Sequence, residues 1–284
     1  PLVLSFAQQR LWFLAQLEGQ SATYNMPAAL HLEGQLDETA LIRTLTALIQ
    51  RHHSLRLCFP MVDGEVTVQL NDVYNPLAVT DLSDLPGTEQ QRRVTEWISN
   101  HAQTPFDLST GPLFSLRLLK LGKQEQVLLF NMHHIIGDGW SMGVLIREWG
   151  QIYNAYAQNQ GHRLPQLPIQ YTDCAAWQRS WLQGEILDRQ LAYWSEKLTG
   201  APGLLELPTD YPRPAVMCCR GKHLRRPLAE ECTRGLKRLS RQHGVTVFMT
   251  LLAAFKVLLF RYSGQTNLVV GTPIANRTHR QTED

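Results

Sequence analysis

The sequence predicts an α/β fold with mixed sheets, arranged in two lobes that meet near residue 180. Segments with apolar residues at helical spacing alternate with short runs that are apolar throughout, as in helices that flank buried strands. The 284 residues suffice for one large domain or two ordinary ones. A hydrophobic content of 44% and a charged content of 18% are typical of a globular chain and exclude a disordered one.

The N-terminal part begins with a predicted strand at 28–32 and a helix at 36–51. Apolar residues of the second segment recur at i, i+1, i+4, i+7 and i+8, which places them on one face of a helix. Asp37 is suited to cap that helix. Residues 54–59 are then expected to be extended.

A hairpin and another helix follow. Residues 114–120 and 126–132 lie on either side of a turn that contains Gly122. Residues 127–130 are apolar on both faces, which is typical of a central strand covered on both sides. Ser141 is expected to cap the next helix.

The C-terminal part is predicted to be mainly helical. A Pro-marked loop at 161–168 leads into a helical region that ends near Gly200, and residues 207–214 contain too much proline for a helix or a central strand. Two helices and a buried strand are expected at 229–243, 246–262 and 267–271.

Composition excludes several classes of function. A net charge of +2 indicates no nucleic-acid partner. Five cysteines without a CxxC pair indicate reduced thiols in a cytoplasmic protein and no zinc site. The most apolar stretch, 245–260, contains Lys256 and falls short of the roughly 20 residues that span a bilayer, so it predicts a core helix and no membrane partner. The N-terminus has neither Met nor a signal peptide, which indicates a piece of a longer polypeptide.

The main chemical feature is His-His-Ile-Ile-Gly-Asp-Gly at 133–139, directly after the buried strand. Adjacent side chains of a strand point to opposite faces, so one histidine should enter a cavity and the other support it. Gly139 permits a close approach of backbone or substrate. A structural role for both histidines stays open, as does a metal site of His133, His134 and Asp138, although opposed histidines are poor joint ligands. Alone, this pattern indicates no more than a candidate acyltransferase.

Five segments, in order along the chain, resemble the motifs of condensation domains of nonribosomal peptide synthetases. They lie at 5–14, 51–59, 132–141, 171–177 and 270–277. Three positions depart from the family pattern: His53 replaces Glu, Leu57 replaces Thr and Cys174 replaces an aromatic residue. The residues after Gly139 differ from those of epimerization domains, and the aspartate-rich motif of heterocyclization domains is absent.

The resemblance implies a fold of two chloramphenicol-acetyltransferase-like lobes. Residues 1–178 would form the N-terminal lobe and residues 179–284 a partial C-terminal lobe. Because family members are longer and carry two further motifs, the second lobe is expected to be truncated. We therefore expect the isolated chain to be weakly active or inactive.

The resemblance also implies an acyltransferase that forms peptide bonds in secondary metabolite biosynthesis. The amine of an acceptor aminoacyl thioester would attack a donor thioester, and the form of the 270–277 motif suggests a donor with an L-configured residue. Both substrates would arrive on 4′-phosphopantetheine arms of upstream donor and downstream acceptor peptidyl carrier proteins, next to an adenylation domain. The domain itself would bind no cofactor.

Each motif residue receives an expected role by this resemblance. His134 would position the nucleophile and act as a base, and His133 would shape the motif from the other face. Asp138 belongs to the catalytic motif; it would be structural and pair with Arg56, with proton transfer as the alternative. Gly139 would line the substrate tunnel or simply form a turn. Arg51 would support the structure.

A further set would line or brace the tunnel, with packing as the alternative for each member. It consists of Ser5, Arg10, Trp177, Asn276 and Arg277. Tyr171 and Trp177 are expected to be core aromatic residues. Two other functions stay open: an acyltransferase of the same fold that uses acyl-coenzyme A, and a non-catalytic recruitment module. The presence of His134 argues against the second.

Overall fold

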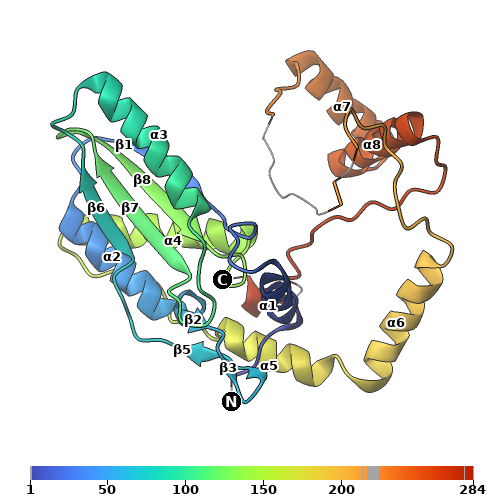
Figure 1. Cartoon of the computed structure of the whole chain (residues 1–284), viewed down its shortest axis with the longest axis horizontal. Helices are drawn as coiled ribbons and strands as arrows, with labels where there is room; N and C mark the ends of the chain where they lie inside the picture. The colour runs from blue at the N-terminus through green and yellow to red at the C-terminus, as the bar shows by residue number, and fades with distance from the viewer. Residues whose placement is uncertain (1, 213, 216–223, 278, 284) are drawn as a thin grey trace. The chain divides into compact units, whose positions relative to one another are not determined.

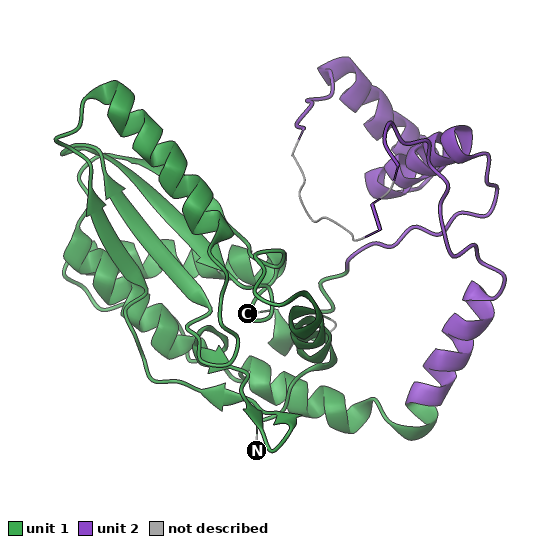
Figure 2. Ribbon diagram, viewed as in Figure 1, with its two compact units in different colours: residues 1–186, 274–284 green, residues 187–273 purple. Residues whose placement is uncertain are grey.

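The computed structural model describes residues 2–212, 214–215, 224–277 and 279–283 (Figure 1). The chain divides into two compact units, one of residues 1–186 with 274–284 and one of residues 187–273 (Figure 2). We call them unit 1 and unit 2. The assignment of residues 1–178 and 179–284 as two acetyltransferase-like lobes stays a prediction.

Unit 1 contains a four-stranded sheet with the order β1-β8-β7-β6. The strands are β1 (Ala28–Glu33), β2 (Leu57–Cys58), β3 (Met61–Val62), β4 (Glu65–Val66), β5 (Gln69–Leu70), β6 (Leu77–Asp81), β7 (Phe114–Lys120) and β8 (Glu125–Met132). β6 pairs with β7 in parallel, whereas β8 pairs antiparallel with both β1 and β7. Two short antiparallel ladders, β2–β5 and β3–β4, lie outside this sheet. The predicted mixed α/β class, first strand and hairpin are confirmed.

Helices cover both faces of the sheet (Figure 1). The helices and 3-10 turns of unit 1 are α1 (Phe6–Glu18), α2 (Glu38–Arg51), η1 (His53–Arg56), α3 (Gly87–Gln103), α4 (Gly139–Ala157), α5 (Tyr171–Trp181) and η2 (Arg280–Thr282), and α6 (Gly184–Leu198) runs from unit 1 into unit 2. The helix predicted at 36–51 is confirmed as α2, and Asp37 caps it by accepting from the Ala40 N–H at 2.9 Å.

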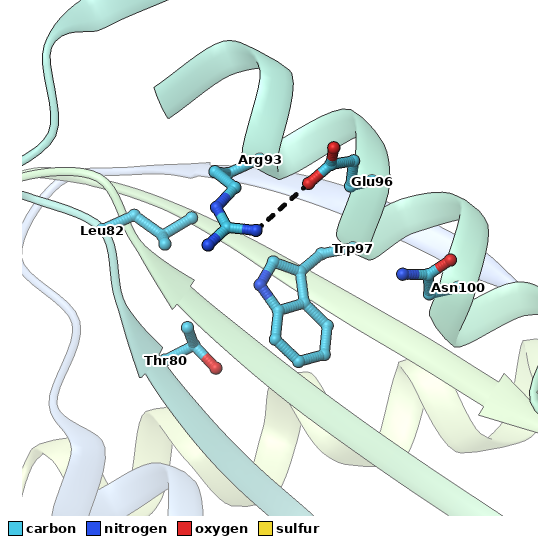
Figure 3. Close-up of a pocket in the computed structure, with 6 residues that line it drawn as sticks. All are labelled: Thr80, Leu82, Arg93, Glu96, Trp97 and Asn100. Atoms are coloured by element: carbon cyan, nitrogen blue, oxygen red, sulfur yellow. Dashed lines mark hydrogen bonds and ion pairs between the residues drawn. The ribbon is translucent and has the colours of Figure 1, made fainter. Parts of the chain in front are cut away.

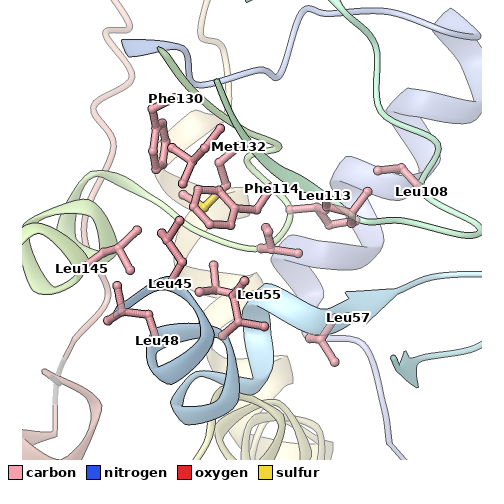
Figure 4. Packing of buried hydrophobic residues seen from close by; sticks show 14 of the residues in the cluster. Leu45, Leu48, Leu55, Leu57, Leu108, Leu113, Phe114, Phe130, Met132 and Leu145 are labelled. Carbon is pink, nitrogen blue, oxygen red and sulfur yellow. The ribbon is translucent and has the colours of Figure 1, made fainter. Parts of the chain in front are cut away.

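The core depends on the alternation of side chains along β8. Leu128, Phe130 and Met132 belong to the large cluster formed with α2 and α4 (Figure 4). Val127 and Leu129 belong to a smaller cluster with side chains of α3. Because successive residues of a strand point to opposite faces, a strand under two helical layers must be apolar throughout. The prediction of a strand covered on both sides is confirmed.

Two details of unit 1 differ from the predictions. The cap of α4 is Asp138 rather than Ser141, because Ser141 is already the third helical residue and its N–H donates to Asp138 Oδ1 at 2.8 Å. The segment predicted to be extended at 54–59 begins as the 3-10 turn η1. The chain reverses after α2, where the Leu55 N–H donates to the His52 carbonyl at 3.1 Å and the Leu55 side chain becomes buried.

Unit 2 contains α7 (Glu230–Gln242) and α8 (Val247–Ser263), which confirm the two helices predicted there. The strand predicted at 267–271 is wrong: these residues form no strand, since the described part of unit 2 offers no other strand to pair with. The expectation of a core helix at 245–260 is also wrong. Within α8 only Leu259 is buried, whereas Phe248 is 59% exposed, because α7 is the main element that packs on it.

No single helix in the described residues is both long and apolar enough to cross a membrane. The pair α7 and α8, bent by 106°, meets that criterion only when the two are taken together, by length and composition.

Candidate active site

His134 lies in the loop from β8 to α4, whose backbone is fixed by hydrogen bonds. The His133 N–H donates to the Leu113 carbonyl at 2.9 Å, and the His134 N–H donates to the Tyr24 carbonyl at 2.8 Å. Within 131–136 every side chain except that of His134 is buried. The loop thus holds one exposed imidazole between anchored neighbours.

His133 has the opposite environment. Its side chain is only 3% exposed, and the Phe106 ring stands edge-on to it with a centroid distance of 6.4 Å. Nδ1 accepts a hydrogen bond from the Ile135 N–H at 3.1 Å. Burial, with a smaller contribution from His134, lowers the pKa of His133 to about 4. At neutral pH this imidazole is therefore uncharged and keeps the lone pair that the Ile135 N–H needs.

The first and fourth motifs meet beside this loop. Ser5 is buried and caps α1, where its hydroxyl accepts from the Gln8 N–H at 3.1 Å. The same hydroxyl lies 2.9 Å from the hydroxyl of Tyr171 on α5. Burial raises the pKa of Tyr171. Arg10 lies on α1 as an exposed residue.

Asp138 pairs with Arg277, which corrects the expected pair with Arg56. Arg277 Nη2 lies 3.4 Å from Asp138 Oδ1 and donates to Ser141 Oγ at 3.1 Å. Burial alone would raise the pKa of Asp138, but hydrogen bonds from Ser141 and the Arg277 guanidinium outweigh it and lower the pKa. The carboxylate thus binds a helix N-terminus and a cation together.

Arg56 is directed elsewhere by the β2–β5 ladder. Leu57 pairs with Leu70 in that ladder, so the preceding Arg56 lies opposite Asn71. The Asn71 N–H donates to the Arg56 carbonyl at 2.9 Å, and Arg56 Nη1 donates to the Asn71 carbonyl at 3.1 Å. This register directs the guanidinium of Arg56 to Asn71.

Arg51 belongs to a buried ionic cluster that the sequence did not lead us to expect. Arg51 Nε donates to both carboxylate oxygens of Glu148 on α4 at 3.1 and 3.0 Å, and His52 Nε2 lies 2.7 Å from Glu148 Oε2. Burial would raise the pKa of Glu148, but hydrogen bonds from His52 and Arg51 together lower it. Glu148 could have been suspected, because it shares the buried face of α4 with Leu145 and Ile152.

The remaining predicted residues lie at or near the surface of unit 1. A Cβ at Gly139 would meet no atom within 4 Å, and Asn276 has a positive φ of 54°. Trp177 is 44% exposed, so it is not the core residue we expected. It stacks on Trp181 at 5.5 Å and meets the His279 ring edge-on at 5.0 Å, because its position on α5 faces away from the buried Thr172 and Ala175.

A pocket of about 230 Å³ lies between α3 and β6 (Figure 3). It is lined by Thr80, Leu82, Arg93, Glu96, Trp97 and Asn100. Arg93 and Glu96 form an ion pair at 3.3 Å, and the Trp97 ring is covered by the Arg117 guanidinium at 4.1 Å. None of the predicted site residues lines this pocket. Among the described residues, no group of three His, Cys, Asp or Glu side chains is placed to hold a metal ion.

Comparisons with known proteins agree on one family. Residues 2–284 match the family described as "Condensation domain". Over 283 residues the chain is 50% identical to a component of linear gramicidin synthase from Brevibacillus parabrevis, and the match covers 99% of the chain and 6% of that protein. Malpinin synthetase of Mortierella alpina is 44% identical over 282 residues, which are 99% of this chain and 4% of that protein. The chain thus spans a small part of the curated relatives that it matches.

Solved structures show the same fold. A four-domain nonribosomal peptide synthetase bound to AMP and glycine matches with a TM-score of 0.85 and 28% identity, over 99% of this chain and 21% of that one. The first condensation domain of the CDA synthetase matches in fold with a TM-score of 0.78 and 23% identity, over 99% of this chain and 67% of that one.

Proposed function

Because the chain belongs to the condensation-domain family of nonribosomal peptide synthetases, we propose that it catalyses amide bond formation between two carrier-bound thioesters. The observation that carries this proposal is the position of His134, an exposed imidazole on a loop whose neighbouring side chains are buried. A nucleophile or base that must meet a substrate needs this combination of exposure and fixed backbone.

The role of His134 follows from the energetics of the amine. A free α-amino group has a pKa of about 7.7–8.0, so making it neutral at pH 7 costs only about 1 kcal/mol. Correct placement of two reactants can contribute roughly 7–11 kcal/mol. His134 therefore acts first by orienting the acceptor amine and second by accepting its proton.

The reaction has a simple atom balance. The amine nitrogen attacks the donor thioester carbonyl, and the C–S bond breaks as the new C–N bond forms. The proton lost from nitrogen passes to His134 and then to the departing thiolate. The products are an amide on the acceptor arm and a free thiol on the donor arm.

The wider context belongs to the same proposal. The substrates arrive on 4′-phosphopantetheine arms of an upstream donor and a downstream acceptor carrier protein, with an adenylation domain adjacent, in the cytoplasm. The donor residue has the L configuration, and Ser5, Arg10, Trp177, Asn276 and Arg277 contribute to or brace the substrate tunnel. His133 and Asp138 shape the loop that carries His134, Gly139 lines the tunnel beside it, and Arg51 and Arg56 support the surrounding structure. Asp138 acts through its cap on α4 and its pair with Arg277.

Single-turnover experiments with the chain test this function, because they detect product even when the reaction is slow. Two aminoacyl-loaded carriers are mixed with wild type, His134→Ala or His31→Ala, and the dipeptidyl carrier is quantified by mass spectrometry. His31 is an exposed histidine of β1, paired with Glu125 at 3.0 Å, and serves as the matched control. We expect product with wild type and His31→Ala only.

Two results would contradict the proposal. Product formation by His134→Ala at the wild-type rate would exclude the role of His134. Product from acyl-coenzyme A but not from a carrier-bound donor would favour the other acyltransferase class.

A further inference from the structure

Gln8 connects the first motif directly to the loop that carries His134. Its side chain is 3% exposed, although glutamine is a mostly exposed residue type. Nε2 donates to the Ile135 carbonyl at 3.3 Å, and Oε1 accepts from the Ser5 N–H at 3.0 Å. The two ends of one amide therefore bind α1 and the loop, 127 residues apart in the chain.

The orientation of this amide is determined by its partners. The Ser5 N–H is a donor, and of the two ends of the Gln8 amide only the oxygen can accept from it. The NH₂ group must therefore face the Ile135 carbonyl. Ser5 in turn contacts Tyr171 of α5 through its hydroxyl, at 2.9 Å. The Ser5 N–H thus fixes the oxygen of the Gln8 amide, and the NH₂ group at the other end of the amide donates to the loop.

Ile135 is the residue next to His134, and both its backbone groups are occupied. Its N–H donates to His133 Nδ1 at 3.1 Å, and its carbonyl accepts from Gln8. The Ile135 N–H belongs to the peptide unit that follows His134, and the Ile135 carbonyl belongs to the next unit, so the two hydrogen bonds hold two successive peptide units in a buried region. Loss of the Gln8 donor would remove one of these two restraints on the backbone that follows His134.

We propose that Gln8 is a positioning residue that sets the direction of His134 through the Ile135 carbonyl. This inference rests on the proposed function only where it predicts turnover. A capping role alone requires the Gln8 oxygen, which accepts from Ser5, and not the nitrogen. A change at the Gln8 nitrogen alone therefore separates the positioning role from the capping role.

Gln8→Glu keeps the shape and the acceptor for Ser5 but replaces the NH₂ donor by an oxygen. An ionised carboxylate would face the Ile135 carbonyl, acceptor against acceptor. Protonation restores a donor, and burial raises the pKa of a carboxyl group, so the defect should recede as the pH falls. The titratable side chains that this hydrogen-bond network reaches are Tyr171, whose pKa is raised, and His133, whose pKa is about 4.

The matched control is Gln9→Glu, which places the same charge one residue further along α1. Gln9 is exposed, and its Oε1 accepts from Arg179 at 2.6 Å, so the charge meets a cation there. Single-turnover amide formation is measured for both variants and wild type between pH 6 and 8.5. In parallel, the imidazole C–H signals are followed by NMR, with the His134 signal identified from its loss in His134→Ala.

At pH 8.5 we expect Gln8→Glu to lower turnover about tenfold relative to wild type, the effect of one buried hydrogen bond lost. The ratio to wild type should rise at least about threefold by pH 6 as the carboxyl group protonates. The difference in the His134 signal between variant and wild type should shrink over the same range. Gln9→Glu should match wild type throughout.

A loss in Gln8→Glu that does not change with pH, or an unchanged His134 signal, would overturn the inference. If wild type forms no product, turnover cannot rank the variants, and the NMR comparison alone decides the role of Gln8. If Gln8→Glu does not fold, Gln8→Met replaces it. That variant lacks both the donor to Ile135 and the acceptor for the Ser5 N–H without adding charge. It should displace the His134 signal at every pH, and no displacement would count against the inference.

Discussion

Acidification should destabilise the chain through the buried His133. Its pKa in the folded chain is about 4, whereas an unfolded chain has a histidine pKa of about 6.5. Between these values the unfolded state binds a proton that the folded state does not. The contribution of the uncharged His133 to the free energy of unfolding is therefore fully present above about pH 6.5 and declines as the pH falls. The difference between the two pKa values corresponds to about 3 kcal/mol of free energy of unfolding, of which about 2 kcal/mol is lost by pH 5.

The structural consequence concerns the loop directly. A proton on His133 Nδ1 would meet the Ile135 N–H, donor against donor, at a contact that is now a 3.1 Å hydrogen bond. His133→Asn removes the titration but keeps an acceptor, since the side-chain oxygen of asparagine can take the place of Nδ1.

The assay is urea unfolding of wild type and His133→Asn at pH 7.5, 6, 5 and 4.5. Other groups also titrate, such as His101, whose pKa is lowered by burial, but they are present in both proteins and cancel in the comparison. We expect wild type to lose about 2 kcal/mol relative to His133→Asn between pH 7.5 and 5. A stability difference that stays constant with pH would refute the reasoning.

Two further changes test the ionic contacts of unit 1 by denaturant unfolding. Glu148→Gln should lower the free energy of unfolding by about 3 kcal/mol, because it leaves the largely buried Arg51 without its counter-charge, whereas the exposed Glu185→Gln should change it little. Asp138→Ala should cost about 2 kcal/mol through the lost cap and ion pair, and a double-mutant cycle with Arg277→Met should give a coupling of about 1 kcal/mol. No coupling with Arg277 would contradict the observed pair, and an equal cost for Glu148→Gln and Glu185→Gln would contradict the buried cluster.

Local patterns in the sequence were sufficient for the central part of unit 1. The apolar run of β8 predicted a strand covered on both faces, and the stripe of α2 with Asp37 predicted that helix and its cap. These features depend on residues within a few positions of one another. The histidine motif after β8 was found in the same way, because it follows directly from the position of that strand.

Burial in unit 2 could not be obtained from the same patterns. α8 is apolar enough to read as a core helix, yet Phe248 and Val257 are about 60% exposed and only Leu259 is buried. The sequence shows which side chains are apolar and would be stabilised by burial. Whether they are buried depends on the elements that pack against them. The strand predicted at 267–271 failed for the same reason, since a strand requires a partner.

The sequence by itself thus determined the type of the main elements, the motif at 133–139 and the resemblance to one family, all of which depend on local order along the chain. Only the tertiary structure decided the partners of polar side chains. Asp138 pairs with Arg277 rather than Arg56, and Glu148 and Gln8 emerged as contacts of distant segments. A hydrogen bond requires two groups within about 3 Å, and that distance depends on how the backbone folds between them.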